Sequence, residues 1–281
     1  MNAVREALVN GQAERLLVIL GAGYTGRRVY QKASSHNRPV LATSRNPDRL
    51  VGFVPPERRL QFDLADPTTW NNVPPGSDIL WCFPAEPPDL VRAFATATNL
   101  VSRRLVVLGS TSAYRLSPPD KYPPPWIDET APLEMHIPRV QGEEFLRTDC
   151  HAVVLRVAGI YGPGRNPLRW ISQGRVGPSR KYVNLIHIED LVETCLAALE
   201  RGVPGEAYNV SDGVPRTWKD ICRMAKATFG IDPSRESADQ SAGKRISNGK
   251  LLSLLAAAGS PPLYTDLVQS LKRIIAEEAL T

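Results

Sequence analysis

The sequence of 281 residues contains few cysteines, and their spacing fits neither a metal site nor a redox pair. None of the four stands in a C-x-x-C motif, so we expect no metal and free thiols in a reducing cytoplasm. No apolar run approaches the length that spans a membrane, and residues 1–15 are too polar for a signal peptide. These absences predict a cytoplasmic protein with no membrane partner. The cysteines are Cys82, Cys150, Cys195 and Cys222.

Strongly basic segments are also missing. The net charge is +5, but no basic run with interleaved aromatic residues indicates nucleic-acid binding, so we expect a phosphorylated small molecule instead. The length permits one large α/β domain or two fused lobes, and 42% hydrophobic residues suffice for a sizeable core. Prolines gather at residues 84–88 and 118–125, which predicts long ordered loops there.

The most informative stretch is a glycine motif after a run of aliphatic residues. Residues 16–20 are all aliphatic, Gly-Ala-Gly-Tyr-Thr-Gly follows at 21–26, and a helix-compatible segment comes next. A buried strand, a G-x-G-x-x-G turn and a helix form the dinucleotide-binding arrangement, with the pyrophosphate at the helix N-terminus. The alternative is a glycine-rich turn that binds nothing. The motif predicts cofactor contacts at Gly21, Gly23, Tyr24, Thr25 and Gly26.

Segments of strand and helix type alternate along the first 160 residues. Strands are predicted at residues 16–20, 40–43, 60–62, 79–83, 105–108 and 153–157, and helices at 25–35, 90–101 and 139–147. Such alternation is typical of an α/β fold with a Rossmann-like, doubly wound parallel sheet. Residues 1–15 are predicted to form a short helix or arm ahead of the first strand.

After residue 162 the regular alternation is lost. Short strands are predicted at residues 183–186 and 208–210, and helices at 188–199, 218–229, 251–258 and 267–278. We therefore predict a Rossmann domain over residues 1–160 and a smaller substrate-binding lobe over residues 161–281. The two are expected to be interwoven and to share some elements, because no clean linker separates them.

The end of the second strand bears on the choice of cofactor. In NAD-preferring Rossmann folds an acidic residue accepts the ribose 2′-OH at this point, but this chain has Ser44 and Arg45. Both side chains can donate to a 2′-phosphate, which a carboxylate would repel. The strand end therefore predicts NADP as the cofactor, with NAD as the alternative. For Arg45 itself, the alternative is a solvated loop residue that binds nothing.

Two further strand ends carry polar residues. Asp63 and Leu64 follow the third strand, where the carboxylate can bond the adenine amino group; a helix N-cap at Asp63 or Asp66 is the alternative. Three hydroxyl residues follow the fifth strand, and hydroxyls at the carboxyl end of a central strand lie beside the ligand crevice. The predicted substrate ligands there are Ser110, Thr111 and Ser112.

The order of these motifs resembles the extended short-chain dehydrogenase/reductases of the NAD-dependent epimerase/dehydratase group. The resemblance covers nearly the whole chain and includes Leu-Arg-x-x-x-x-Tyr-Gly-Pro-Gly at 155–164, Asn-Leu-Ile-His-Ile-Glu-Asp at 184–190 and Tyr-Asn-Val-Ser at 208–211. It implies that Ser110 orients the reacting oxygen of the substrate. We also expect Pro84 and Gly159 at the cofactor.

The chain departs from that family at its catalytic pair. The family uses a Tyr as acid/base and a Lys four residues later, but none of the eight tyrosines here has Lys at that spacing. Aligned on the helix entry at residues 139–143, Arg139 takes the Lys place and Met135 takes the Tyr place. Arg139 can still donate to the nicotinamide ribose, whereas Met135 cannot transfer a proton. The chain is therefore identified as an atypical member.

Several residues are candidates for the missing acid/base. His136 is adjacent to the Tyr place and titrates near neutrality, and Glu134 is the other neighbour. We expect Tyr114 to lie in the core and His187 to be a capping or core histidine. Two residues that flank a glycine turn are expected to contact substrate or cofactor, with loop packing as the alternative; they are Tyr161 and Arg165.

Together the motifs predict an NADP-dependent oxidoreductase, epimerase or dehydratase. It would act on a hydroxyl or carbonyl of a small polar substrate such as a nucleotide sugar, with Ser110, Arg139 and His136 as the catalytic residues. The alternative is a non-catalytic NADP-binding sensor or regulatory protein, which Met135 favours. The family often pairs through the helices that here are residues 90–101 and 139–147, which predicts a homodimer.

Overall fold

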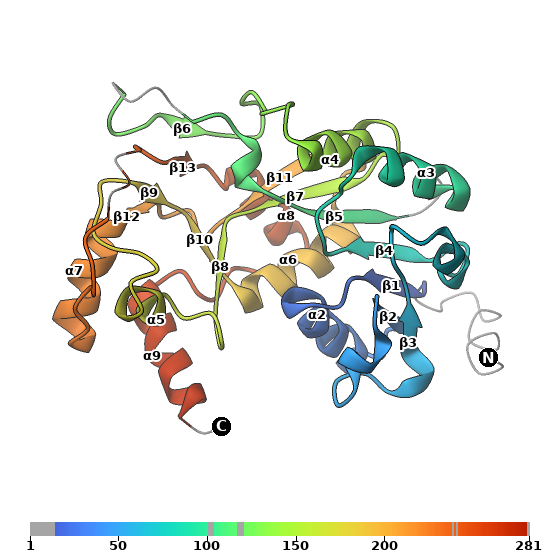
Figure 1. The fold of residues 1–281 in the computed structure, drawn as a ribbon, viewed down its shortest axis with the longest axis horizontal. Coiled ribbons are helices and arrows are strands. Elements are labelled where there is room, and N and C mark those ends of the chain that lie inside the picture. The colour runs from blue at the N-terminus through green and yellow to red at the C-terminus, as the bar shows by residue number, and fades with distance from the viewer. Residues whose placement is uncertain (1–14, 101–103, 117–120, 238, 240, 280–281) are drawn as a thin grey trace. The chain divides into compact units, whose positions relative to one another are not determined.

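The computed structural model describes residues 15–100, 104–116, 121–237, 239 and 241–279. Its main sheet has seven strands in the order β11-β7-β5-β4-β1-β2-β3 (Figure 1). The strands are β1 (Leu17–Leu20), β2 (Val40–Ser44), β3 (Arg59–Gln61), β4 (Asp78–Trp81), β5 (Leu105–Ser110), β7 (Val153–Val157) and β11 (Ala207–Val210). β1 pairs in parallel with both β2 and β4, and β2–β3 and β4–β5 are parallel too. The predicted doubly wound Rossmann-like sheet is thus confirmed.

The helices follow the predicted positions closely. They are α2 (Tyr24–Ser35), α3 (Pro88–Thr98), α4 (Pro138–Thr148), α5 (Pro167–Ser172), α6 (Ile188–Arg201), α7 (Trp218–Phe229), α8 (Gly249–Ala257) and α9 (Leu267–Glu278). α5 was not predicted, because six residues are too few to show a helical period. The predicted arm at residues 1–15 lies, apart from Arg15, outside the described residues.

Three short strand pairs lie outside the main sheet. β8 (Gly159–Tyr161) pairs with β10 (Leu185–His187), β9 (Tyr182–Val183) with β12 (Arg216–Thr217), and β6 (Trp126–Ile127) with β13 (Arg245–Ile246). Most of these strands have two residues, which is too short for the alternation that marks a strand in a sequence. Among the described residues, no helix is both long and apolar enough to cross a membrane.

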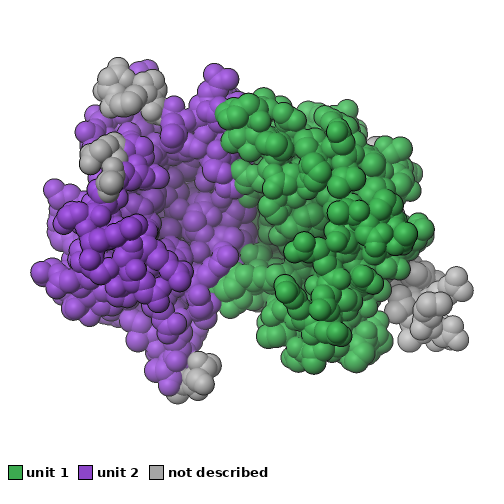
Figure 2. All heavy atoms as spheres, viewed as in Figure 1, with its two compact units in different colours: residues 1–109, 135–155, 192–207 green, residues 110–134, 156–191, 208–281 purple. Residues whose placement is uncertain are grey.

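The chain divides into two compact units whose segments alternate along the sequence (Figure 2). The first unit comprises residues 1–109, 135–155 and 192–207, and the second comprises residues 110–134, 156–191 and 208–281. The main sheet also includes β11, which comes from beyond residue 161. A boundary at residue 160 between a cofactor domain and a substrate lobe stays a prediction.

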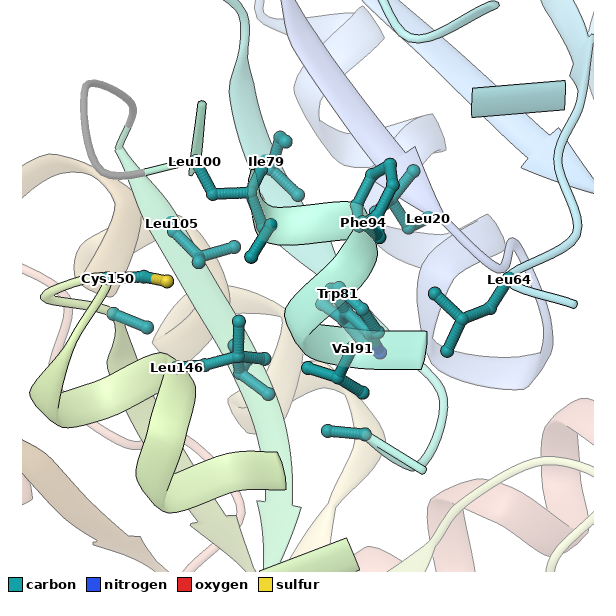
Figure 3. Close-up of a cluster of buried hydrophobic side chains, with 14 of the residues drawn as sticks. Leu20, Leu64, Ile79, Trp81, Val91, Phe94, Leu100, Leu105, Leu146 and Cys150 are labelled. Carbon is teal, nitrogen blue, oxygen red and sulfur yellow. The ribbon is translucent and has the colours of Figure 1, made fainter. Parts of the chain in front are cut away.

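The core of the first unit lies around α3 and the central strands. Trp81 of β4 and Phe94 of α3 meet edge to face with ring centroids 5.7 Å apart, and both side chains are fully buried (Figure 3). Leu146 of α4 joins the same cluster (Figure 3), and Val140 of α4 is also fully buried. These two apolar residues of α4 therefore pack inside the chain itself. The homodimer stays a prediction.

The second unit has a core of its own. Side chains of α5, α7 and α9 gather around buried Tyr161, with Leu271 and Ile274 contributed by α9. The carboxylate of Asp190 accepts hydrogen bonds from the N–H groups of Leu263 and Tyr264, which fixes the chain ahead of α9. The two units thus each have the packed interior that a stable fold needs.

Candidate functional site

The glycine motif forms a tight turn between β1 and α2. Gly21 has a φ of +83°, where side chains are rarely tolerated, and a Cβ there would lie 2.8 Å from Cδ1 of Phe83. A Cβ on Gly26 would lie 3.0 Å from the carbonyl oxygen of Gly21 and 3.0 Å from Cγ2 of Ile19. Both glycines are therefore required by the protein's own packing, which brings α2 close to β1.

Gly23 stands in a different environment. No protein atom lies within 4 Å of the place that its Cβ would occupy. α2 begins directly after it at Tyr24, with no side-chain cap and no acidic residue in its first turn. The open space at Gly23 therefore faces the positive end of a helix dipole, an arrangement that favours an anion such as a pyrophosphate.

A cavity of about 890 Å³ opens along this turn, within the first unit. Its lining includes Gly21, Gly23, Ser44, Arg45, Asp63, Leu64 and Pro84, all of which the sequence predicted at the cofactor. Other predicted cofactor residues do not line it: Tyr24, Thr25, Gly26, Arg139 and Gly159. Thr25 and Gly26 are buried under the turn, and Gly159 belongs to β8 in the second unit.

The lining of the cavity includes three arginines, Arg27, Arg45 and Arg49. Ser44 ends β2, Arg45 is exposed, and Arg49 lies on the 3₁₀ turn Pro47–Leu50 that follows. The Arg27 guanidinium lies 4.3 Å from the Phe53 ring centroid, and its Nε donates to the Ala22 carbonyl at 3.2 Å. Three cationic residues are thus available around an anionic ligand in the cavity.

Two hydrogen bonds fix the backbone on both sides of Arg45. The hydroxyl of Ser44 accepts a hydrogen bond from the N–H of Asn46 at 3.2 Å. Asn46 in turn caps the turn, with its Oδ1 accepting from the N–H of Asp48 at 3.0 Å. The Ser44 hydroxyl hydrogen remains available as a donor toward the cavity, because the bond to Asn46 uses only its oxygen.

Asp63 and Asp66 have separate roles. The Asp66 carboxylate caps the 3₁₀ helix Pro67–Asn72 by accepting from the N–H of Thr68, so the N-cap alternative holds for Asp66. One carboxylate oxygen of Asp63 accepts from the N–H of Ala65 at 3.0 Å. Asp63 also lines the cavity, so its other oxygen can still accept from a ligand.

Arg139 is held by a buried carboxylate. Glu143 is 2% exposed, and its Oε1 lies 3.5 Å from Nε of Arg139, one helical turn away on α4. A Cβ on Gly109, at the end of β5, would lie only 2.6 Å from Oε2 of Glu143. The strand therefore needs glycine here so that Glu143 can lie against it and orient Arg139. The contact between Glu143 and Arg139 was not predicted, although their i, i+4 spacing in the sequence indicates it.

The predicted substrate hydroxyls lie at the end of β5 in the second unit. Ser110 caps the short turn Thr111–Ala113 by accepting from the N–H of Ser112 at 3.1 Å, and the two serine hydroxyl oxygens are 3.0 Å apart. Ser112 is exposed, while Ser110 and Thr111 are half-buried. The structure thus brings these predicted substrate-binding residues together on one turn.

Tyr114 is a structural residue, as expected. It is 1% exposed, donates to Oδ1 of Asn209 at 2.6 Å and accepts from Nη1 of Arg156 at 2.9 Å. Burial raises the pKa of its phenol, and Arg156 opposes that rise. Both hydrogen-bonding functions of this phenol are therefore engaged inside the core.

Met135 and its two neighbours differ in their exposure. The side chain of Met135 is 48% exposed, and His136 is exposed as well. Glu134 is half-buried and belongs to the second unit, where its N–H donates to the carbonyl of Ala113 at 2.8 Å. No catalytic role of His136 follows from this placement, and it stays a prediction.

The two residues that flank the glycine turn after β8 differ in burial. Tyr161 is fully buried and meets the His187 ring edge-on, which fits the loop-packing alternative; burial raises its pKa to about 12. Arg165 is exposed on the turn. His187 accepts from the N–H of Glu189 at 3.2 Å and stacks on Tyr264, so it is a capping and core histidine as expected.

Comparison with solved structures identifies the fold. A functionally unknown conserved protein from Silicibacter pomeroyi is similar with a TM-score of 0.73 and 24% identity, over 94% of this chain and 99% of that one. A short-chain dehydrogenase/reductase superfamily protein from Agrobacterium tumefaciens, with bound NAD, has a TM-score of 0.71 and 17% identity. The match covers 94% of this chain and 96% of that one. The chain thus has the same fold as this short-chain dehydrogenase/reductase superfamily protein.

This fold is also found in nucleotide-sugar enzymes. The dTDP-glucose 4,6-dehydratase from Bacillus anthracis, in complex with NAD, has a TM-score of 0.72 and 14% identity over 96% of this chain and 97% of that one. Among curated proteins, Protein YeeZ of Escherichia coli K12 is 30% identical over 101 residues, which are 35% of this chain and 36% of that protein. No protein-family model matches the chain.

Proposed function

We propose that the chain is an NADP-dependent oxidoreductase of the extended short-chain dehydrogenase/reductase family, in its epimerase/dehydratase group. Support comes from the cavity whose lining includes Gly23, Arg27, Arg45 and Arg49, with open space at Gly23. The glycine turn fits a pyrophosphate, and the arginines fit a 2′-phosphate. When bound, the nicotinamide would take up or supply a hydride.

The substrate is proposed to be a small polar molecule with a hydroxyl or carbonyl, of the nucleotide-sugar class. Ser110 and Ser112 offer hydroxyls on one turn, and Arg139, positioned by Glu143, offers a cation to the nicotinamide ribose. The structural resemblance to dTDP-glucose 4,6-dehydratase supports this class. A non-catalytic NADP-binding sensor is the second candidate, because Met135 stands where the family has its Tyr.

The cofactor proposal predicts that NADPH binds more tightly than NADH and that Arg45 is a cause. No hydrogen bond or ion pair engages the Arg45 side chain within the described residues, so it can turn to a 2′-phosphate. A charge-assisted contact of this kind contributes about 1.5–3 kcal/mol, and solvent exposure favours the lower end. Arg45→Ala should therefore weaken NADPH binding about tenfold while NADH binding stays unchanged.

Calorimetry with both cofactors tests this prediction. Ser44→Asp should weaken NADPH binding and strengthen NADH binding, because a carboxylate repels the phosphate and accepts from the free ribose hydroxyls. Arg201→Ala is the matched control, since Arg201 is an exposed arginine of the same unit that does not line the cavity. A wild-type protein that prefers NADH, or an unchanged NADPH/NADH ratio in Arg45→Ala, would contradict the proposal.

Catalysis itself is separable from cofactor binding. Single-turnover absorbance at the nicotinamide band, with a panel of nucleotide sugars and ketones, should show hydride transfer if the protein is an enzyme. Tight NADPH binding without any absorbance change on the panel would favour the sensor.

A further inference from the structure

Phe53 is an exposed aromatic residue whose ring contacts one of the arginines of the cavity. Its side chain is 48% exposed and does not belong to the buried cluster of the first unit. Its backbone is nevertheless fixed, because its N–H donates to the carbonyl oxygen of Leu50 at 3.1 Å, at the end of the 3₁₀ turn Pro47–Leu50. The Arg27 guanidinium lies 4.3 Å from the centroid of the ring. The ring is therefore placed against Arg27 and not in the core.

The guanidinium of Arg27 is held at three points. Its Nε donates to the carbonyl oxygen of Ala22 at 3.2 Å, and its Nη2 donates to the carbonyl oxygen of Arg49 at 2.5 Å. The Phe53 ring is the third contact. Ala22 belongs to the glycine turn and Arg49 to the 3₁₀ turn after β2, so the guanidinium bridges these two segments of the first unit. A cation held in this way loses little side-chain freedom when an anion binds.

The edge of this guanidinium still has donors to offer. Of its five N–H groups, the one on Nε and one on Nη2 serve the two carbonyls, and stacking on a ring uses the face and not the edge. Within the part of the chain that the structure describes, Nη1 of Arg27 has no hydrogen-bond or ion-pair partner. Arg27 is half-buried and lines the cavity. Its remaining N–H groups can therefore bind a phosphate in the cavity through two parallel hydrogen bonds.

The other two arginines of the cavity are not held in this way. Arg45 and Arg49 are both exposed, and no hydrogen bond or ion pair engages either side chain among the described residues. Each side chain must be ordered when a phosphate binds, and the lost freedom reduces its contribution to the affinity. Arg27 is thus the arginine whose contribution is reduced least.

The bond to Arg49 indicates which phosphate the guanidinium meets. Residues 45–49 follow β2, and an arginine near this point accommodates the 2′-phosphate in Rossmann folds that bind NADP. Ser44 stands directly before this segment and also lines the cavity, with its hydroxyl hydrogen available as a donor. The pyrophosphate has a separate place, at the open face of Gly23 and the N-terminus of α2. These contacts favour the 2′-phosphate over the pyrophosphate as the ligand of Arg27.

We propose that Arg27 is the main residue that selects NADPH over NADH, and that Phe53 is a positioning residue that holds its guanidinium toward the 2′-phosphate. This role rests on the proposed function, in which Arg27 is only one of three arginines that fit this phosphate. Phe53 does not line the cavity, so a change at Phe53 reaches the cofactor only through Arg27.

Calorimetry with NADPH, NADH and adenosine 2′,5′-bisphosphate tests the role of Arg27. Arg27→Met should weaken NADPH and the bisphosphate about 100-fold, the upper range for a charge-assisted contact, while NADH affinity stays unchanged. Arg27→Lys keeps the charge but not the planar fork, so its NADPH/NADH ratio should be intermediate. Arg28→Met is the matched control. Arg28 also lies over a ring, that of Tyr24 at 4.0 Å, and donates to a carbonyl, but it does not line the cavity.

Phe53→Leu tests the positioning role at an exposed site where folding is not at risk. Leucine keeps an apolar side chain but has no π-face, so NADPH affinity should fall about two- to fivefold, with NADH affinity unchanged. The same substitution made in Arg27→Met should have no further effect, because the ring acts through the guanidinium. Val51→Ala, at a second exposed apolar residue of the same loop, is the control and should bind both cofactors as wild type does.

The possible results are distinguishable. Equal losses of NADPH and NADH affinity in Arg27→Met would overturn the proposal, because the guanidinium would then serve the pyrophosphate or only the shape of the turn. An unchanged NADPH/NADH ratio in Arg27→Met, or a Phe53→Leu effect that persists without Arg27, would overturn it too. If Arg27→Met does not fold, the ratios of Arg27→Lys and Phe53→Leu decide in the same way. A wild-type protein that does not prefer NADPH overturns the proposed cofactor, and the role of Arg27 with it.

Discussion

Replacing Gly142 with alanine is expected to destabilise the first unit strongly. Gly142 lies on α4 where the helix meets the loop after β4, and a Cβ there would lie 1.9 Å from the carbonyl oxygen of Ala85. The neighbour is backbone, so it cannot turn away as a side chain could. Overpacking of this kind typically costs about 1–3 kcal/mol and occasionally more, and we expect about 3 kcal/mol here. The melting temperature should then fall by about 6–12 °C.

The matched control is Gly249→Ala on α8. Its Cβ would meet only Oγ of Ser247, at 3.9 Å, so the substitution should be neutral or stabilise the protein by up to about 1 kcal/mol through helix propensity. Differential scanning calorimetry of both variants measures the contrast. Equal melting temperatures for the two would show that α4 and the loop can separate without loss, and would refute the close packing of α4 on the loop at Ala85.

Replacing Gly23 with valine is expected to abolish cofactor binding while the fold remains intact. Beyond its chain neighbours, no atom lies within 4 Å of the Cβ position of Gly23, so a side chain there meets no clash. Its φ of −82° and ψ of −148° lie outside the main regions of non-glycine residues, so we expect a modest fall in melting temperature with the fold retained. The same side chain would occupy the proposed pyrophosphate place. We expect NADPH affinity to fall at least about 100-fold, which corresponds to about 2.7 kcal/mol.

Calorimetry of NADPH binding and thermal melting without ligand test this prediction together. Gly23→Ala should show an intermediate affinity, and Gly249→Ala should bind as wild type does, because Gly249 does not line the cavity. An unchanged affinity in Gly23→Val would rule out the turn as the pyrophosphate site. A large fall in melting temperature would instead show that Gly23 is needed for the fold.

The sequence was most informative where the chemistry is local. The run at residues 16–20 and the glycine motif placed β1 and α2 to within one residue, because a fully buried strand and a tight turn leave few alternatives. The same holds for α7 and α9, whose predicted bounds match the structure. Ser44, Arg45 and Asp63 were predicted to bind the cofactor, and they line one cavity because parallel strands bring their carboxyl ends to one edge of the sheet.

Only the tertiary structure decided which contacts join segments that are distant in the sequence. Arg49 reaches the cavity through a 3₁₀ turn, which has too few residues to give a period in the sequence. Tyr161 has the motif position of a ligand-contacting residue, yet packing buries it completely. Lys244 meets the Ser110 turn across 133 residues, and burial alters its pKa. Contacts of this range and the desolvation that they cause depend on the packed fold, whereas the strand, the turn and the helix of the glycine motif follow from neighbouring residues alone.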